Sequence, residues 1–246
     1  MISVTILTFN SQKYLQRVLE STASFDEVLL LDSGSEDKTL EIAKSFANVV
    51  VYQAPLDEGF GVQHQRTESL AKNEWILSLD SDEVLSGRLV EEIESLSLDR
   101  RCIYSIKRDN YYRGKKIECC SWYPDRVYRL YNKNTTGFDS KKVHESVKID
   151  GLSIIYLKHP MTHYSYENAS DFLAKMQKYS ELFANENLGK KSSSPFKAIS
   201  RGCFTFFKSY ILKKGFLQGY EGFVISVYNA QSAFWKYIKL YEKSGI

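Results

Sequence analysis

Three acidic side chains follow an apolar segment in the run Trp75–Glu83, which reads WILSLDSDE. The apolar part is typical of a buried strand, whereas unpaired carboxylates are costly to bury, so we expect the acids at the exit of the strand. In an open α/β sheet, ligands bind beyond the carboxyl ends of the strands, and carboxylate oxygens hold hard divalent cations. The run therefore predicts a D-x-D site for a cation and a diphosphate. An acidic loop that only solvates the strand end is the alternative.

Two other predicted strands also end in polar residues. Residues 8–11 (TFNS) close the first strand, and residues 32–35 (DSGS) follow the second. Because the carboxyl ends of parallel strands lie at one edge of a sheet, these segments and the D-x-D run can converge on one ligand. Asp32 can accept a hydrogen bond from a base or from a ribose hydroxyl. On its own, the DSGS segment is more often a turn that starts a helix.

The strands that would position these residues alternate with helices through residues 1–100. Buried strands are predicted at 2–9, 27–31, 49–52 and 75–79. Amphipathic helices are predicted at 12–23, 37–47 and 62–72. This alternation predicts an α/β fold with a mainly parallel central sheet, right-handed crossovers and helices on both faces.

The second half of the chain has a mixed pattern. Short β-like segments are predicted at 102–106, 127–131, 143–149 and 154–157. Helical spacing returns after Asn168, a candidate N-cap, and continues beyond the linker 189–195 in the stretches 196–213 and 216–243. We therefore expect a catalytic domain at residues 1–188, made of the halves 1–100 and 101–188, and a C-terminal helical region at 189–246.

The composition limits the classes of protein that fit this chain. Of its 246 residues 43% are hydrophobic, and the net charge of +3 does not suit a protein that coats nucleic acid. The four cysteines show no C-x-x-C spacing, which favours a reducing cytoplasm over zinc or disulfides. The N-terminus lacks a signal-peptide pattern, and no stretch reaches the roughly 18 uncharged apolar residues of a spanning helix. We expect a cytoplasmic protein that does not cross a bilayer.

Two common nucleotide-binding motifs are absent from the sequence. No G-x-G-x-x-G follows the first strand, and no G-x-x-x-x-G-K-[ST] occurs, which argues against dehydrogenases and P-loop enzymes. The first strand ending in TFN, the DSGSxDxT segment at 32–39 and the LDxDE segment at 79–83 instead resemble the family 2 glycosyltransferases of GT-A fold. The resemblance covers most of the chain and implies a Rossmann-like sheet with a C-terminal helical extension.

Further segments are similar to the branch of that family that includes bacterial lipopolysaccharide-core β-1,4-glucosyltransferases. They are GFGVQ at 59–63, RLY at 129–131, VHE at 143–145, HYSY at 163–166 and GFxxG at 215–219. The chain departs from this branch after Gln63, where His64 and Gln65 stand in place of the usual Lys-Asn. The resemblance implies an inverting enzyme that transfers a hexose, with glucose expected, from a UDP-sugar to a lipid-linked or core oligosaccharide acceptor.

The resemblance also implies which residues bind the donor and its cation. The donor-binding residues would be Thr8, Phe9, Asn10, Asp32, Gln63, Asp80 and Ser81. Asp82 would bind Mg²⁺ or Mn²⁺, which offsets the charge of the departing diphosphate as a Lewis acid. His163 is a candidate additional ligand, since Mn²⁺ tolerates imidazole, and a hydrogen-bonded structural histidine is an equal alternative.

Inversion at the anomeric carbon needs a general base that takes a proton from the acceptor hydroxyl. We assign this role to Glu145, although without the resemblance a surface glutamate would be the simpler interpretation. Asp125 is the fallback base, because residues 122–125 (WYPD) read as a loop able to face an acceptor sugar.

The predicted helix 196–213 carries an aromatic face beside a basic stripe. The face comprises Phe196, Cys203, Phe207 and Tyr210, and the stripe comprises Lys197, Arg201 and Lys208. This pattern suits peripheral binding to an anionic membrane surface at the inner face of the cytoplasmic membrane. A helix that packs its aromatic face onto the catalytic domain is the alternative.

Two other functions fit parts of the sequence. A sugar-phosphate nucleotidyltransferase would share the sheet, but it needs a glycine-rich, basic loop after the first strand, and residues 8–11 offer none. A non-catalytic sugar-nucleotide sensor would keep the donor pocket and lack a working base. Slow release of UDP from UDP-glucose would distinguish an enzyme from a sensor.

Overall fold

A computed structural model describes residues 1–140 and 145–245 and divides the chain into two compact units. Unit 1 comprises Met1–Asp109 and Asp125–Tyr164, and unit 2 comprises Asn110–Pro124 and Ser165–Ile246. The domain boundary expected between residues 188 and 189 falls inside unit 2, at the end of a helix. The assignment of residues 1–188 to catalysis stays a prediction.

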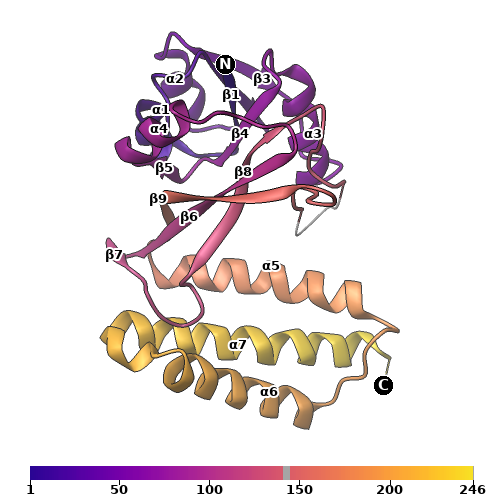
Figure 1. The fold of residues 1–246 in the computed structure, drawn as a ribbon. Coiled ribbons are helices and arrows are strands. Elements are labelled where there is room, and N and C mark those ends of the chain that lie inside the picture. Colours follow the sequence, from indigo (N-terminus) through magenta and orange to yellow (C-terminus); the bar gives the residue numbers. More distant parts are fainter. Residues whose placement is uncertain (141–144, 246) are drawn as a thin grey trace. The chain divides into compact units, whose positions relative to one another are not determined.

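The first half of unit 1 is built from alternating strands and helices (Figure 1). Its strands are parallel and lie in the order β3-β2-β1-β4. Their bounds are Ile2–Thr8 for β1, Glu27–Asp32 for β2, Val49–Gln53 for β3 and Trp75–Asp80 for β4. The connecting helices are α1 (Gln12–Ser21), α2 (Thr39–Lys44) and α3 (Phe60–Leu70). The predicted α/β fold is confirmed.

Hydrophobic burial accounts for this part of the fold. Every residue of β2 is buried, as expected for a central parallel strand covered on both faces. Helix α1 buries Leu15, Val18 and Leu19, which recur at helical spacing and pack into the same core as β1 and β4.

The remaining strands of unit 1 continue the sheet in antiparallel orientation. The order from β4 is β4-β8-β6-β9-β5, so the sheet is parallel only on its N-terminal side. The bounds are Glu83–Leu85 for β5, Cys102–Tyr112 for β6, Asp125–Asn132 for β8 and Ser153–Tyr166 for β9, with α4 at Gly87–Glu94. The short β7 (Lys115–Lys116) pairs with the end of β6.

Two sequence-based predictions differ from this part of the structure. The predicted strand 143–149 begins at residues 143 and 144, which lie outside the described residues. From 145 to 149 only Val147 pairs, in an isolated bridge with Phe138, so the strand prediction is wrong there. Strand β9 is far longer than the expected 154–157 and lies between β6 and β5, and β5 is an element that the sequence pattern did not reveal.

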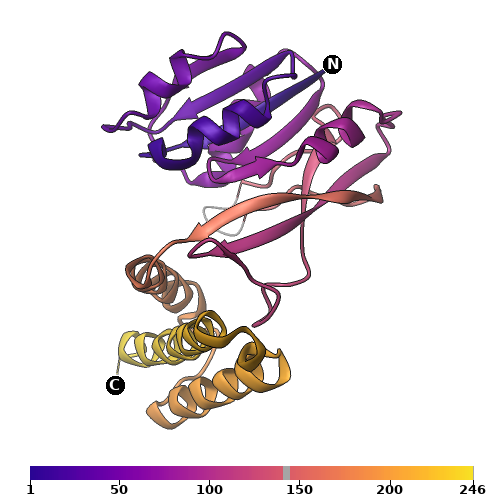
Figure 2. The same ribbon diagram turned by 90° about the vertical axis from the view of Figure 1, so that its left-hand side faces the viewer.

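Unit 2 consists mainly of three helices, with α7 in contact with both α5 and α6 (Figure 2). Helix α5 (Ala169–Asn187) begins at the predicted N-cap Asn168, which forms a capping box with Asp171. Helix α6 (Pro195–Phe207) runs into a π-helical turn η1 (Lys208–Leu212), a 3₁₀ turn η2 (Gly215–Gln218) and α7 (Gly219–Lys243). Within the described part of the chain, no helix is long and apolar enough to cross a membrane.

Candidate active site

The three polar strand ends meet at one edge of the parallel strands. The Thr8 hydroxyl at the end of β1 donates to Asp32 Oδ1 at the end of β2, at 3.0 Å. The Ser11 hydroxyl, just after β1, donates to Ser81 Oγ, just after β4, at 2.9 Å. Segments 24 and 70 residues apart in sequence therefore form one rim, which is the convergence expected from a parallel sheet.

Asp32 organises the loop that follows β2. Its side chain is buried, Oδ1 accepts from the hydroxyls of Thr8 and Ser35, and Oδ2 accepts from the backbone N–H groups of Gly34 and Ser35. Burial raises the pKa of Asp32, but these hydrogen bonds outweigh it and lower the pKa below its usual value. If Asp32 bound a sugar nucleotide, that contact would have to replace one of these hydrogen bonds. The role of Asp32 in binding the sugar nucleotide therefore stays a prediction.

Phe9 and Asn10 form the outer part of the rim. The phenyl ring of Phe9 is 60% exposed and available for stacking on a base. Asn10 has a left-handed backbone (φ 48°), its N–H donates to Ser35 Oγ at 2.8 Å, and its Oδ1 accepts from the Glu36 N–H at 2.9 Å. These bonds tie the loop after β1 to the loop after β2.

Gln63 is at the rim but is occupied by structural hydrogen bonds. Its side chain is buried, and Nε2 donates to Ser33 Oγ at 3.3 Å and to the Ala54 carbonyl at 2.9 Å. Its Oε1 accepts from Arg66 at 2.8 Å. The structure thus gives Gln63 the role of fastening α3 to the rim, and its expected donor contact stays a prediction.

Asp80, Asp82 and His163 form a cluster suited to a divalent cation. Asp80 ends β4, Asp82 lies in the turn before β5, and His163 lies on β9 opposite Glu83. One ligand atom from each of the three lies within 4.8 Å of the others, and His163 Nε2 is 3.6 Å from Asp82 Oδ1. Two carboxylates and an imidazole fit Mn²⁺, and the carboxylates alone fit Mg²⁺. His163 lies within β9, whereas the strand predicted at 154–157 ended before it.

A cluster of buried ion pairs holds the Asp80 carboxylate in place. Arg129 Nη2 on β8 bonds to Asp80 Oδ2 at 2.5 Å and to Glu83 Oε1 at 2.6 Å. Glu83 is fully buried and also accepts from Arg108 at 3.2 Å and from the Asp80 N–H at 3.0 Å. Burial raises the pKa of Asp80, but Arg129 and the other positive groups around it, Arg108 among them, together outweigh burial and hold the pKa well below its usual range. Asp80 therefore stays ionised.

The sequence interpretation missed the two arginines of this cluster. Arg129 stands in the RLY segment that carried the family resemblance, but nothing in its spacing indicated its partners. Arg108 had no sequence signal, because its pairing depends on the register of β6 with β8. Three carboxylates, those of Asp80, Glu83 and Asp125, pair with the two guanidinium groups, and the carboxylate of Asp82 lies beside His163. The excess of negative charge favours a divalent cation.

Asp125 belongs to this cluster rather than to a loop. It is the first residue of β8, lies opposite Arg108 in the register and accepts from Arg108 Nε at 2.9 Å. The expectation that residues 122–125 form a loop is therefore wrong for Asp125 itself. Its role as the fallback base stays a prediction, and the ion pair with Arg108 makes it a weaker candidate than a carboxylate outside the cluster.

Glu145 is partly exposed and follows residues 141–144, which the structure does not describe. The segments on either side of it are held together: the Asp139 N–H donates to the Ser146 carbonyl at 3.0 Å, and Phe138 pairs with Val147. The structure thus fixes the chain next to Glu145, and its role as the base stays a prediction.

Helix α3 holds Phe138 by three separate contacts. The His64 ring stacks on the Phe138 ring, Gln65 Nε2 donates to the Phe138 carbonyl at 2.9 Å, and Glu68 Oε1 accepts from the Phe138 N–H at 3.0 Å. His64 and Gln65 are the two residues at which the sequence departs from the branch of glycosyltransferases that it resembles. They serve here to anchor the segment that leads to Glu145.

A model of a known protein family matches more than half of the chain. Residues 3–156 match the family described as Glycosyl transferase family 2. The chain therefore belongs to glycosyl transferase family 2.

Several relatives match nearly the whole chain, among them the following two. An uncharacterized glycosyltransferase of Rickettsia typhi (strain ATCC VR-144 / Wilmington) is 32% identical, with 99% of this chain and 87% of the relative covered. The lipopolysaccharide core biosynthesis glycosyltransferase LpsC of Rhizobium meliloti (strain 1021) is 24% identical, with 100% of this chain and 93% of the relative covered.

Among solved structures, the UDP complex of TarS 1-349 from S. aureus is 17% identical with a TM-score of 0.49, and 98% of this chain and 90% of that chain are covered. Glucosyl-3-phosphoglycerate synthase from Mycobacterium tuberculosis, in complex with Mn²⁺, UDP and glucosyl-3-phosphoglycerate, is 23% identical with a TM-score of 0.35. That comparison covers 46% of this chain and 44% of that chain.

Proposed function

We propose that this glycosyltransferase moves a hexose, with glucose expected, from a UDP-sugar to a saccharide hydroxyl with inversion at the anomeric carbon. The observation that carries the proposal is the cluster of Asp80, Asp82 and His163 at the rim formed by the loops after β1, β2 and β4. Membership of the family supports a sugar-transfer reaction, and the rim offers the ligands that a nucleotide diphosphate and its cation require.

Asp82 and His163 would hold a divalent cation, which supplies Lewis-acid stabilisation of the departing diphosphate when it is bound. Arg129 keeps the Asp80 carboxylate in place and ionised, so that it can orient the donor beside the cation. Phe9 would stack on the base, and the Ser81 hydroxyl, already bonded to Ser11, would lie beside the ribose or the diphosphate.

Glu145 would act as the general base. Its carboxylate would accept the proton of the acceptor hydroxyl as the hydroxyl oxygen attacks the anomeric carbon from the face opposite the diphosphate. The bonds that join the segment 137–139 to 146–148 restrict where this carboxylate can lie. Such positioning reduces the entropy lost on reaching the reactive geometry.

A lipid-linked or core oligosaccharide is the proposed acceptor, and the cytoplasmic side of a membrane is the proposed site of action. The name of LpsC, which refers to lipopolysaccharide core biosynthesis, and the similarity of LpsC over the whole chain support this acceptor class. We propose no nucleic-acid partner, because the charges of the chain are nearly balanced.

The proposal can be tested by incubating the purified chain with a panel of UDP- and GDP-sugars and Mn²⁺ and measuring release of the nucleoside diphosphate. Slow release of UDP, fastest from UDP-glucose, is expected because water can replace a missing acceptor. Binding of UDP-sugars without any release, even with oligosaccharide acceptors, would indicate a sensor. If no nucleotide sugar is bound or cleaved, the proposal is wrong.

A further inference from the structure

Helix α6 packs on α7 through small residues. Ala198 and Gly202 of α6 and Ser209 of the following turn η1 are buried, and the Ser226 hydroxyl of α7 donates to Ser209 Oγ at 3.0 Å. A Cβ atom added at Gly202 would lie 3.3 Å from the Ala230 carbonyl oxygen, so the two backbones approach closely. Larger side chains of α6 also reach α7: the Phe206 ring lies edge-on to Phe223, with centroids 6.4 Å apart, and Lys197 and Arg201 lie over the Tyr237 ring.

Three of the four aromatic side chains of α6 are exposed to solvent, and the fourth, Phe206, is half-buried. Phe196 is 81% exposed, and Phe204 and Phe207 are also exposed. The apolar stripe of an amphipathic helix normally faces the core, so an exposed stripe calls for an apolar partner.

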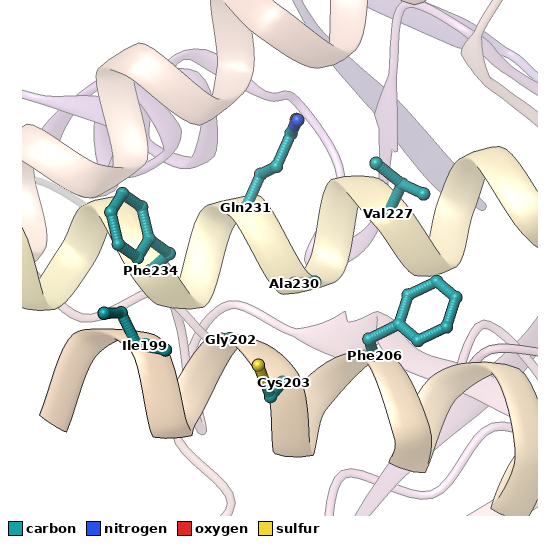
Figure 3. Close-up of a pocket in the computed structure, with 8 residues that line it drawn as sticks. All are labelled: Ile199, Gly202, Cys203, Phe206, Val227, Ala230, Gln231 and Phe234. Atoms are coloured by element: carbon teal, nitrogen blue, oxygen red, sulfur yellow. The ribbon is translucent and has the colours of Figure 1, made fainter. Parts of the chain in front are cut away.

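An open apolar pocket of about 430 Å³ lies between α6 and α7, beside this stripe (Figure 3). Its walls include Ile199 and Phe206 of α6 and Val227 and Phe234 of α7. Its volume is within the range of pockets that take small apolar ligands. The pocket extends the exposed apolar surface into the groove between the helices.

The apolar surface continues into the turn between α6 and α7. We call Ile211, Leu212, Phe216 and Leu217 the apolar tip. All four side chains are exposed, and Leu217 is 69% exposed. The turn beneath them is tightly packed, because a Cβ atom at the buried Gly215 would lie only 2.8 Å from Ser226 Oγ. The tip is therefore a fixed apolar projection.

Charge identifies the kind of partner. Residues 195–220 contain five basic residues and no acidic residue. Lys208, Lys213 and Lys214 are exposed within or beside the apolar tip. An acidic protein or a nucleic acid would satisfy the lysines and leave the apolar side chains in water. Anionic lipids offer phosphate groups to the lysines and acyl chains to the apolar tip.

We propose that α6 and the apolar tip dock on the surface of an anionic lipid bilayer. The tip enters the boundary between headgroups and acyl chains, the lysines bind lipid phosphates, and the pocket between α6 and α7 accommodates a hydrocarbon chain. This docking does not depend on the transfer reaction, although it would hold the protein on a surface that carries lipid-linked acceptors.

The test is sedimentation of the full chain with vesicles of phosphatidylcholine alone or mixed with phosphatidylglycerol. We expect binding only to the anionic vesicles and loss of most binding at about 0.5 M salt, where charges are screened. Leu217→Glu places a negative charge in the apolar tip, and its partition coefficient should fall at least tenfold. The matched control Leu173→Glu replaces a leucine on α5 that is 55% exposed and should bind as the unmodified chain does.

Equal binding to neutral and anionic vesicles, no binding to either, or unchanged binding of Leu217→Glu would each overturn the proposal. Circular dichroism melts of both variants establish that each is folded. Release of UDP from a soluble UDP-sugar should be the same for Leu217→Glu and the unmodified chain. Loss of vesicle binding with retained release separates membrane docking from the proposed reaction.

Discussion

The imidazole ring of His64 stacks on the phenyl ring of Phe138, with ring centroids 3.9 Å apart and planes 9° from parallel. The two residues are far apart in sequence, and the contact joins α3 to the segment that leads to Glu145. His64 Nδ1 also lies 3.5 Å from Ser78 Oγ on β4. One buried histidine thus connects the strand that carries the acids with the segment that leads to the proposed base.

Burial lowers the pKa of His64 to about 4, from an ordinary value of 6.5. The unfolded chain therefore binds a proton below pH 6.5 that the folded chain does not bind until about pH 4. The contribution of His64 to the free energy of unfolding is complete above pH 6.5, falls as the pH is lowered, and should be about 2 kcal/mol smaller at about pH 5. Urea unfolding of the unmodified chain and of His64→Gln, each above pH 6.5 and at about pH 5, measures this difference in the free energy of unfolding. An equal loss in both proteins would contradict the assignment.

Phe138→Ala should impair turnover and spare donor binding. The substitution removes the ring that His64 contacts and loosens the segment before Glu145, while the rim residues that would hold the donor are untouched. We expect kcat to fall about 10²-fold, the usual cost of misplacing a reacting group, with the Kd for UDP and Mn²⁺ unchanged. Tyr156→Ala, an exposed aromatic residue on β9, is the control. A parallel loss of UDP binding would mean that Phe138 supports the rim itself.

Arg129→Met should destabilise the fold. It leaves the buried Glu83 with Arg108 as its remaining guanidinium partner, and removal of one member of a buried ion pair typically costs about 3 kcal/mol. The double variant Arg129→Met/Glu83→Gln should recover part of this loss, because the uncompensated carboxylate is gone. Chemical denaturation of the two variants measures both effects. If the double variant is less stable than the single one, the carboxylate is not the source of the cost.

Glu145→Gln should retain nucleotide binding and lose turnover. The amide cannot accept the acceptor proton, and general-base catalysis is typically worth about 10²–10⁴-fold in rate. Asp125→Asn provides the comparison, since Asp125 is already paired with Arg108. Near-normal transfer by Glu145→Gln, together with a large loss in Asp125→Asn, would reassign the base to Asp125.

The sequence was informative where local pattern determines structure. Buried apolar strands with polar ends predicted the rim, and the D-x-D run predicted carboxylates at its edge. It could not reveal the pairing of Arg129 with Glu83, because that contact depends on how β8 is placed in the sheet. Nor could the sequence reveal that the Gln63 side chain bonds to Ser33 and to the Ala54 carbonyl, and its predicted contact with the sugar donor stays a prediction. Pairings between distant strands have no local signature.

Calorimetric titration of UDP into the unmodified chain and into Asp82→Ala, each with and without Mn²⁺, tests the cation site at the rim most directly. Tight binding by the unmodified chain only when Mn²⁺ is present, and loss of this metal dependence in Asp82→Ala, is the predicted result. Identical titration curves for the unmodified chain with and without Mn²⁺ would contradict a site in which a cation joins Asp82 to the donor diphosphate.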